Sequence, residues 1–157
     1  MNDSGKSVAK LVQEYGITDI KRQVLVISDD INTLQGSLTI QDGGDLKSLA
    51  GQKGQESIAT ELKTTQFIRF RLGVGKPASG SAVTIPQWVL GPFSTEKREM
   101  DLFAYLMGHT TQALFMLIQT NDLAACRKKF AKSSKMPKPS ELVPTTTLES
   151  PIRIEGM

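Results

Sequence analysis

The stretch from Phe67 to Pro77 alternates apolar and polar positions more strictly than the rest of the chain. Side chains of a strand point alternately to its two faces, so this pattern predicts a strand with one apolar face. The apolar positions are Ile68, Phe70, Leu72 and Val74. The other face carries Arg69, Arg71, Gly73 and Gly75. Bases beside positions that lack side chains suit the approach of an anion. The outer face is therefore either an ordinary solvated surface or an anion-binding surface formed by Arg69, Arg71 and Lys76.

The remaining pattern predicts one α/β domain with a twisted mixed sheet flanked by helices. Val24 to Ile27 is a continuous apolar run, typical of a strand that is covered on both faces and lies centrally in a sheet. A long helix begins at Ser94, and its expected core face is Met100, Phe103, Met107, Leu114 and Leu117. The other expected elements are a helix from near the first residue to Gly16, a strand over 38–40, a helix over 55–62 and a short helix around Trp88.

Composition limits the class of protein. The chain has 157 residues, of which 39% are apolar and 22% charged, which fits one globular domain over residues 1–131. Residues 132–157 are basic and rich in proline, so we expect a disordered tail. Cys126 is the only cysteine, which excludes an intrachain disulfide and a cysteine-cluster zinc site. No apolar run approaches the ~20 residues of a membrane span.

The positive charge is concentrated near the carboxyl end. The net charge is +3, and residues 123–140 contain six bases and no acid. Those bases are Arg127, Lys128, Lys129, Lys132, Lys135 and Lys138. Such a run is typical both of a solubilising tail and of a segment that attracts nucleic acid, and both interpretations stay open.

Few residues are candidates for catalysis. The single histidine, His109, lies nine residues after Met100, about 180° around a helix at roughly 100° per residue, so it is expected to face solvent and to take no part in catalysis. Asp29 and Asp30 follow the Val24 to Ile27 strand, at the carboxyl end where α/β sheets bind ligands. Because neighbouring strand residues point to opposite faces, at most one of the two acids faces a site. Neither a metal-ligand cluster nor a phosphate-binding loop of standard spacing is recognisable.

Four sequence blocks occur in an order that resembles the bacterial-type peptidyl-tRNA hydrolase family. They are Met1-Asn2-x-Ser4-Gly5, Val26 to Ile31, Phe67 to Pro77 and Trp88 to Ser94, and the resemblance covers residues 1–131. It implies a monomer that cleaves the ester between a peptide and transfer RNA, with tRNA as its partner, no cofactor and no membrane association. It also implies a cytoplasmic or mitochondrial-matrix location, for which this chain shows no targeting signal.

The resemblance also implies roles for individual residues. Catalysis in the family uses a histidine general base that is oriented by an aspartate, and Asp29 matches that aspartate. Asn2 matches a substrate-binding asparagine of the first block. Lys53 stands where the family has a second substrate-binding asparagine, and an ammonium group cannot supply the carbonyl acceptor. A further departure is Ser28, at a position where the family usually has histidine.

The largest departure concerns the beginning of the chain. The family has a strand, a Gly-Asn-Pro-Gly loop and the catalytic histidine before the Met-Asn block, whereas this sequence starts at that block. The interpretation is that Met1 is an internal start. Asp29 would then have no general base to orient, and such a base is worth ~10²- to 10⁴-fold in rate. The Val24 to Ile27 strand would also lack a neighbouring strand and have an apolar edge. Three hypotheses follow: a shortened hydrolase, a catalytically degenerate tRNA-binding module that uses Lys53 and the bases already named, or a chain that does not fold stably.

Overall fold

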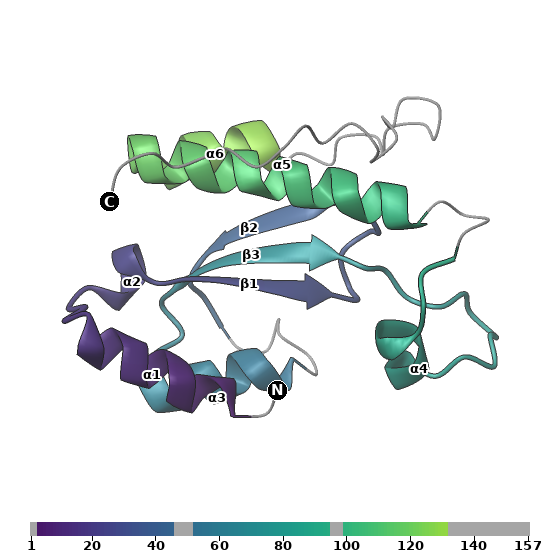
Figure 1. The fold of residues 1–157 in the computed structure, drawn as a ribbon, viewed down its shortest axis with the longest axis horizontal. Coiled ribbons are helices and arrows are strands. Elements are labelled where there is room, and N and C mark those ends of the chain that lie inside the picture. The colour runs from purple at the N-terminus through teal and green to yellow at the C-terminus, as the bar shows by residue number, and fades with distance from the viewer. Residues whose placement is uncertain (1–2, 46–51, 95–98, 132–157) are drawn as a thin grey trace, which may run out of the picture.

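A three-stranded sheet lies between two layers of helices (Figure 1). The computed structural model describes residues 3–45, 52–94 and 99–131. Its helices are α1 (Ser4–Glu14), α2 (Ile20–Gln23), α3 (Lys53–Leu62), α4 (Ile85–Leu90), α5 (Glu99–Thr120) and α6 (Leu123–Phe130). Its strands are β1 (Leu25–Asp30), β2 (Leu38–Asp42) and β3 (Ile68–Gly73). The predicted α/β class with a mixed sheet is confirmed. No described helix is long and apolar enough to cross a membrane.

Strand β3 is the centre of the sheet, with β1 parallel on one side and β2 antiparallel on the other. Its register places Phe70 beside Ile27 of β1 and Ile40 of β2. Because the parallel strands β1 and β3 end together, Asp30 lies beside Gly73 at their carboxyl ends. The loops that follow both strands therefore start at the same end of the sheet, next to α4 (Figure 1).

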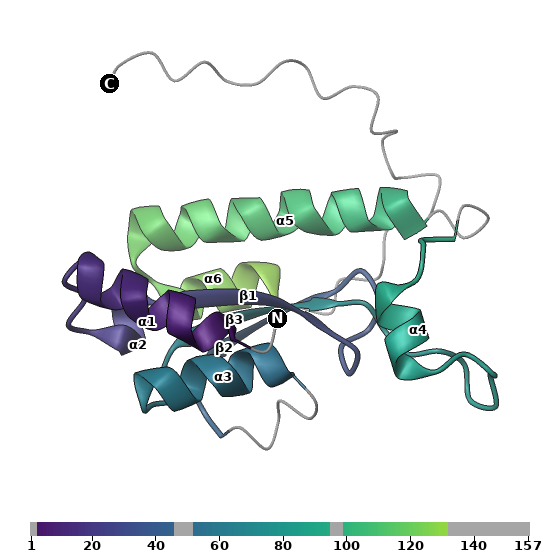
Figure 2. The ribbon, with the colours of Figure 1, turned by 60° about the horizontal axis from the view of Figure 1, so that its bottom comes forward.

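Each face of the sheet has its own hydrophobic core, and Figure 2 shows the helices on either side. Helices α5 and α6 cover the face that carries the apolar positions of β3. The buried residues of that core are Leu38, Ile40, Ile68, Phe70, Leu72, Leu106, Ala113, Leu117, Cys126 and Phe130. Helices α1 and α3 cover the opposite face over Val24 and Phe67. Both faces of β3 are consequently buried.

The predicted central position of the first strand is wrong. β1 is an outer strand of the sheet, and within the described residues nothing pairs with its free edge. Ile27 is 44% exposed as a result. The continuous apolar run indicated a strand correctly, but the residues that would cover both of its sides are not among those described.

The predicted core face of the long helix is wrong at Met100 and Met107, whereas Leu114 and Leu117 do pack in the core. Met100 and Met107 are 56% and 41% exposed, whereas Leu102, Leu106 and Ala113 are buried against the sheet. Apolar residues occur around most of this helix, so their spacing alone does not select the buried side. Since Met100 faces solvent, His109 on the opposite side packs against α6 instead of facing solvent. Residues 132–157, for which we predicted a disordered tail, lie outside the described residues.

Candidate functional site

A cleft of about 560 Å³ lies at the carboxyl end of β1. Its walls are the start of α1, the end of β1, the first turn of α3 and one side of α4. The polar lining residues are Ser4, Ser28, Asp29, Gln52, Lys53 and Gln55. The volume falls within the range of ~300–1,000 Å³ that is usual for ligand sites, and the position is where α/β sheets bind ligands.

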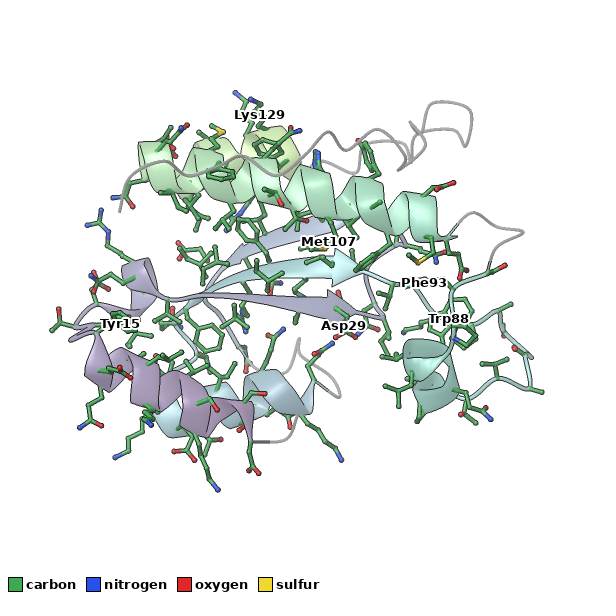
Figure 3. All side chains as sticks on the ribbon, in the orientation of Figure 1. Tyr15, Asp29, Trp88, Phe93, Met107 and Lys129 are labelled. Atoms are coloured by element: carbon green, nitrogen blue, oxygen red, sulfur yellow. The ribbon has the colours of Figure 1, made fainter. Side chains whose placement is uncertain are left out.

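The two adjacent aspartates have separate environments. Asp29 is exposed and lines the cleft, and Figure 3 shows it at the end of β1. Asp30 is 1% exposed and forms an ion pair with Arg71, with 2.8 Å between Oδ2 and Nη2. Its carboxylate also accepts hydrogen bonds from the Asn32 N–H and the Thr33 hydroxyl. The prediction that at most one of the two acids faces the site is confirmed, and that one is Asp29.

Opposing effects act on the pKa of Asp30. Burial alone would raise the pKa of this carboxyl, because it disfavours the charged form. The hydrogen bonds from Thr33, Asn32 and Arg71, together with the charge of Arg71, outweigh burial and hold the pKa below its ordinary value. Asp30 is therefore an ionised structural residue at neutral pH, and it fixes the loop that follows β1.

Two glutamines attach the first turn of α3 to the end of β1. The Gln52 side-chain amide donates a hydrogen bond to the backbone oxygen of Asp29. The Gln55 amide, in a side chain that is 2% exposed, donates to the Ser28 hydroxyl oxygen. Sequence reasoning missed both contacts. The only sequence signal for the Gln55 contact was that Gln55 lies three positions before the apolar Ile58, on the same side of a helix.

Lys53 is the first residue of α3 and is exposed at the rim of the cleft. Asp29 and Lys53 are thus brought to one cavity although 24 positions separate them in sequence (53 − 29). They are the ionisable side chains among the described lining residues, so the cleft offers one carboxylate and one ammonium group. Asn2, the third residue of this predicted set, lies outside the described residues.

The expected open basic face of β3 is wrong. Arg69 and Arg71 do share a face, but their exposed fractions are only 1% and 7%, and the loop after β2 contacts Arg69. Arg71 pairs with Asp30, and Arg69 donates hydrogen bonds to the backbone oxygens of Gly43 and Gly44. Burial and the nearby charge of Arg71 lower the pKa of Arg69. Neither guanidinium is free to meet a phosphate, whereas Lys76 is exposed.

His109 and Cys126 have structural environments away from the cleft lining. His109 Nε2 lies 3.1 Å from the backbone oxygen of Phe130, between α5 and α6. Cys126 is fully buried, and burial, reinforced by the charge of Asp122, raises the pKa of its thiol. The described residues contain no group of three or more His, Cys, Asp or Glu side chains that could hold a metal ion.

The fold and the cleft define an α/β protein with a ligand site at the carboxyl ends of its strands. The family model for peptidyl-tRNA hydrolase matches residues 1–138. A peptidyl-tRNA hydrolase of Dehalococcoides mccartyi is 34% identical over 131 residues, which are 83% of this chain and 65% of that protein. The peptidyl-tRNA hydrolase of Staphylococcus epidermidis is 35% identical over 121 residues, 77% of this chain and 59% of that protein. The chain belongs to the peptidyl-tRNA hydrolase family.

Solved structures agree with this assignment. A crystal structure of an Arg119Gln mutant of peptidyl-tRNA hydrolase from Acinetobacter baumannii matches with a TM-score of 0.66 and 25% identity, over 84% of this chain and 62% of that one. A peptidyl-tRNA hydrolase in complex with N-propanol matches with a TM-score of 0.63 and 25% identity, over 85% and 64% of the two chains. The chain thus spans less than two thirds of the length of each of these relatives.

Proposed function

We propose that this chain forms the substrate cleft of a peptidyl-tRNA hydrolase and that the cleft binds the ester-bearing end of peptidyl-tRNA. The observation that carries this proposal is the cleft at the end of β1, which brings Asp29 and Lys53 together in a chain of this family. Asp29 presents an exposed carboxylate on a backbone that Gln52 holds by a hydrogen bond. A carboxylate fixed in this way suits the orientation of an imidazole that activates water.

The proposed hydrolysis needs a general base that the described cleft does not contain. His109 is the only histidine in the sequence, and it is held against Phe130 between α5 and α6. We therefore assign Asp29 the role of orienting an imidazole and not that of nucleophile. The lack of a general base in the described cleft favours a second candidate function, which is binding of peptidyl-tRNA without cleavage.

Lys53 contributes a positive charge to either function. It is exposed at the first position of α3, where the positive end of the helix dipole adds to its attraction for an anion. We assign it to a phosphate near the 3′ end of the RNA. The candidate binding residues Asn2 and Lys76 are retained with it, whereas Arg69 and Arg71 are not, because both are buried.

Replacing Lys53 with asparagine tests this binding role. Each phosphate contact adds about 0.7 to 0.9 to the slope of log affinity against log salt concentration. We expect Lys53→Asn to weaken peptidyl-tRNA binding several-fold at low salt and to lower the slope by about one contact. Filter binding over a salt series measures both quantities.

Lys63→Asn is the matched control. Lys63 is exposed at the other end of α3, at a backbone φ of 53° that asparagine tolerates. The Lys63→Asn substitution removes the same charge from the end of the same helix, at a position outside the cleft lining. Equal salt slopes for the Lys53 and Lys63 variants would remove Lys53 from the binding site. Absence of salt-dependent binding by the unmodified chain would overturn the proposed function.

A further inference from the structure

A second cavity, of about 340 Å³, lies between α4 and the beginning of α5, beyond the end of β3. Trp88, Phe93 and Phe103 contribute aromatic walls, and Leu102 and Leu106 close its inner side. Figure 3 shows Trp88 and Phe93 at this end of the molecule, on the α5 side of α4. Asp29 and Lys53 line the first cleft and not this cavity, so the two sites have separate chemistry.

Contacts with the surrounding structure fix the aromatic walls. The Trp88 Nε1–H lies 3.2 Å from the backbone oxygen of Val74 and 3.1 Å from that of Gly75, so two main-chain acceptors orient the indole. Phe93 and Phe103 pack with 5.3 Å between their ring centroids and 33° between their planes. The cavity therefore presents preformed aromatic faces.

One charged group lines this cavity among the described residues, and it is an acid. Glu99 is 9% exposed, and its Oε2 accepts a hydrogen bond of 2.7 Å from the Ser94 N–H. Glu99 lies in the first turn of the 22-residue helix α5, where acidic side chains are favourable. Within the described part of the chain, Glu99 forms no ion pair.

A carboxylate beside aromatic faces is the chemical complement of an organic cation. An ammonium group gains from the negative face of an aromatic ring and from a charge-assisted hydrogen bond to a carboxylate, and both gains increase when water is excluded. A neutral apolar ligand would instead leave the buried carboxylate without a counter-charge, which is unfavourable. We propose that the cavity binds a small organic cation, an ammonium group carried on a short alkyl chain. This inference is independent of the proposed function, since it concerns a different cavity.

The single tryptophan of the chain, Trp88, reports on this cavity by its fluorescence. The probes are n-butylammonium, the neutral 1-pentanol, which is one heavy atom larger, and butyrate, all at one ionic strength. We expect n-butylammonium to change the Trp88 emission saturably in the millimolar range. We expect 1-pentanol to bind at least about tenfold more weakly, a difference that corresponds to one charge-assisted hydrogen bond. Equal binding of the two probes, or no saturable change with n-butylammonium, would overturn the proposal.

Glu99→Gln removes the charge while its amide oxygen still accepts the Ser94 N–H, so the local structure should persist. We expect it to weaken n-butylammonium binding about tenfold and to leave 1-pentanol binding unchanged. Asp101→Asn, a charge removal in the same helical turn outside the cavity lining, is the control and should leave both affinities unchanged. Unchanged n-butylammonium affinity in Glu99→Gln would contradict the role of the carboxylate.

Discussion

Gly5→Ala is expected to destabilise the protein by about 3 kcal/mol or more, near the upper end of what overpacking usually costs. A Cβ atom at Gly5 would lie 2.1 Å from the backbone oxygen of Ser57 and 2.7 Å from Cγ of Glu61. The first contact is with main chain, so no side-chain rotation relieves it. Helices α1 and α3 would have to separate, and the hydrogen bond from the Gly5 N–H to Ser57 Oγ, 3.0 Å long, would break.

Thermal unfolding followed by circular dichroism measures this effect. We expect the melting temperature of Gly5→Ala to fall by roughly 10 °C, since 1 kcal/mol corresponds to about 2–4 °C at this chain length. Gly108→Ala is the matched control, because Gly108 lies within α5 and a Cβ there meets nothing within 4 Å. Alanine should stabilise that helix by up to about 1 kcal/mol. An unchanged melting temperature in Gly5→Ala would show that α1 and α3 do not pack this closely.

Asp30→Ala is expected to cost about 3–5 kcal/mol, the usual effect of removing one partner from a buried ion pair. The loss is large because Arg71, 7% exposed, keeps its charge without the carboxylate that faces it. The hydrogen bonds from Asn32 and Thr33 are lost with the same side chain. Urea unfolding measures the difference. Asp29→Ala, at the exposed neighbouring position, should change stability by no more than about 0.5 kcal/mol.

The same ion pair gives stability a defined pH dependence. The folded-state pKa of Asp30 is lowered, so its contribution is fully present above the ordinary carboxyl pKa of about 3.9. The contribution falls as pH decreases from there through the folded-state pKa. We expect Asp30→Ala to unfold with a shallower loss of stability in that acidic range. Equal pH slopes for the variant and the unmodified chain, or equal urea midpoints for the two aspartate variants, would contradict the structural role of Asp30.

The local sequence pattern was sufficient to predict the features that depend on neighbouring residues alone, which are individual strands, their two faces and helix ends. The alternation at residues 68–73 gave the strand β3 and its two faces, and Gly16, with φ of 59°, ends the first helix region as expected. The placement of the Asp29 and Asp30 side chains on opposite faces of β1 follows from the same alternation. Family blocks then supplied Lys53, which the structure places in one cleft with Asp29.

Contacts between residues far apart in sequence decided the rest. Arg69 and Arg71 read as surface bases because their partners, the Gly43 oxygen and the Asp30 carboxylate, are 26 and 41 positions away in sequence. Burial of an arginine depends on those partners, and strand periodicity carries no information about them. The orientation of α5 was undetermined for a related reason, because the neighbouring elements select which of its apolar sides is buried. Both glutamine contacts to β1 also join separate segments.

Peptide release from peptidyl-tRNA, measured with and without free imidazole, tests most directly whether the Asp29 cleft is a hydrolytic site. Imidazole in solution stands in for the general base that the described cleft lacks. We expect it to accelerate release by the unmodified chain, and we expect Asp29→Asn to reduce that acceleration by about tenfold, less than for a tethered base because a diffusing base is less well positioned. Binding without any release would favour the second candidate function. Equal imidazole-dependent release by the unmodified chain and by Asp29→Asn would contradict the assignment of the cleft.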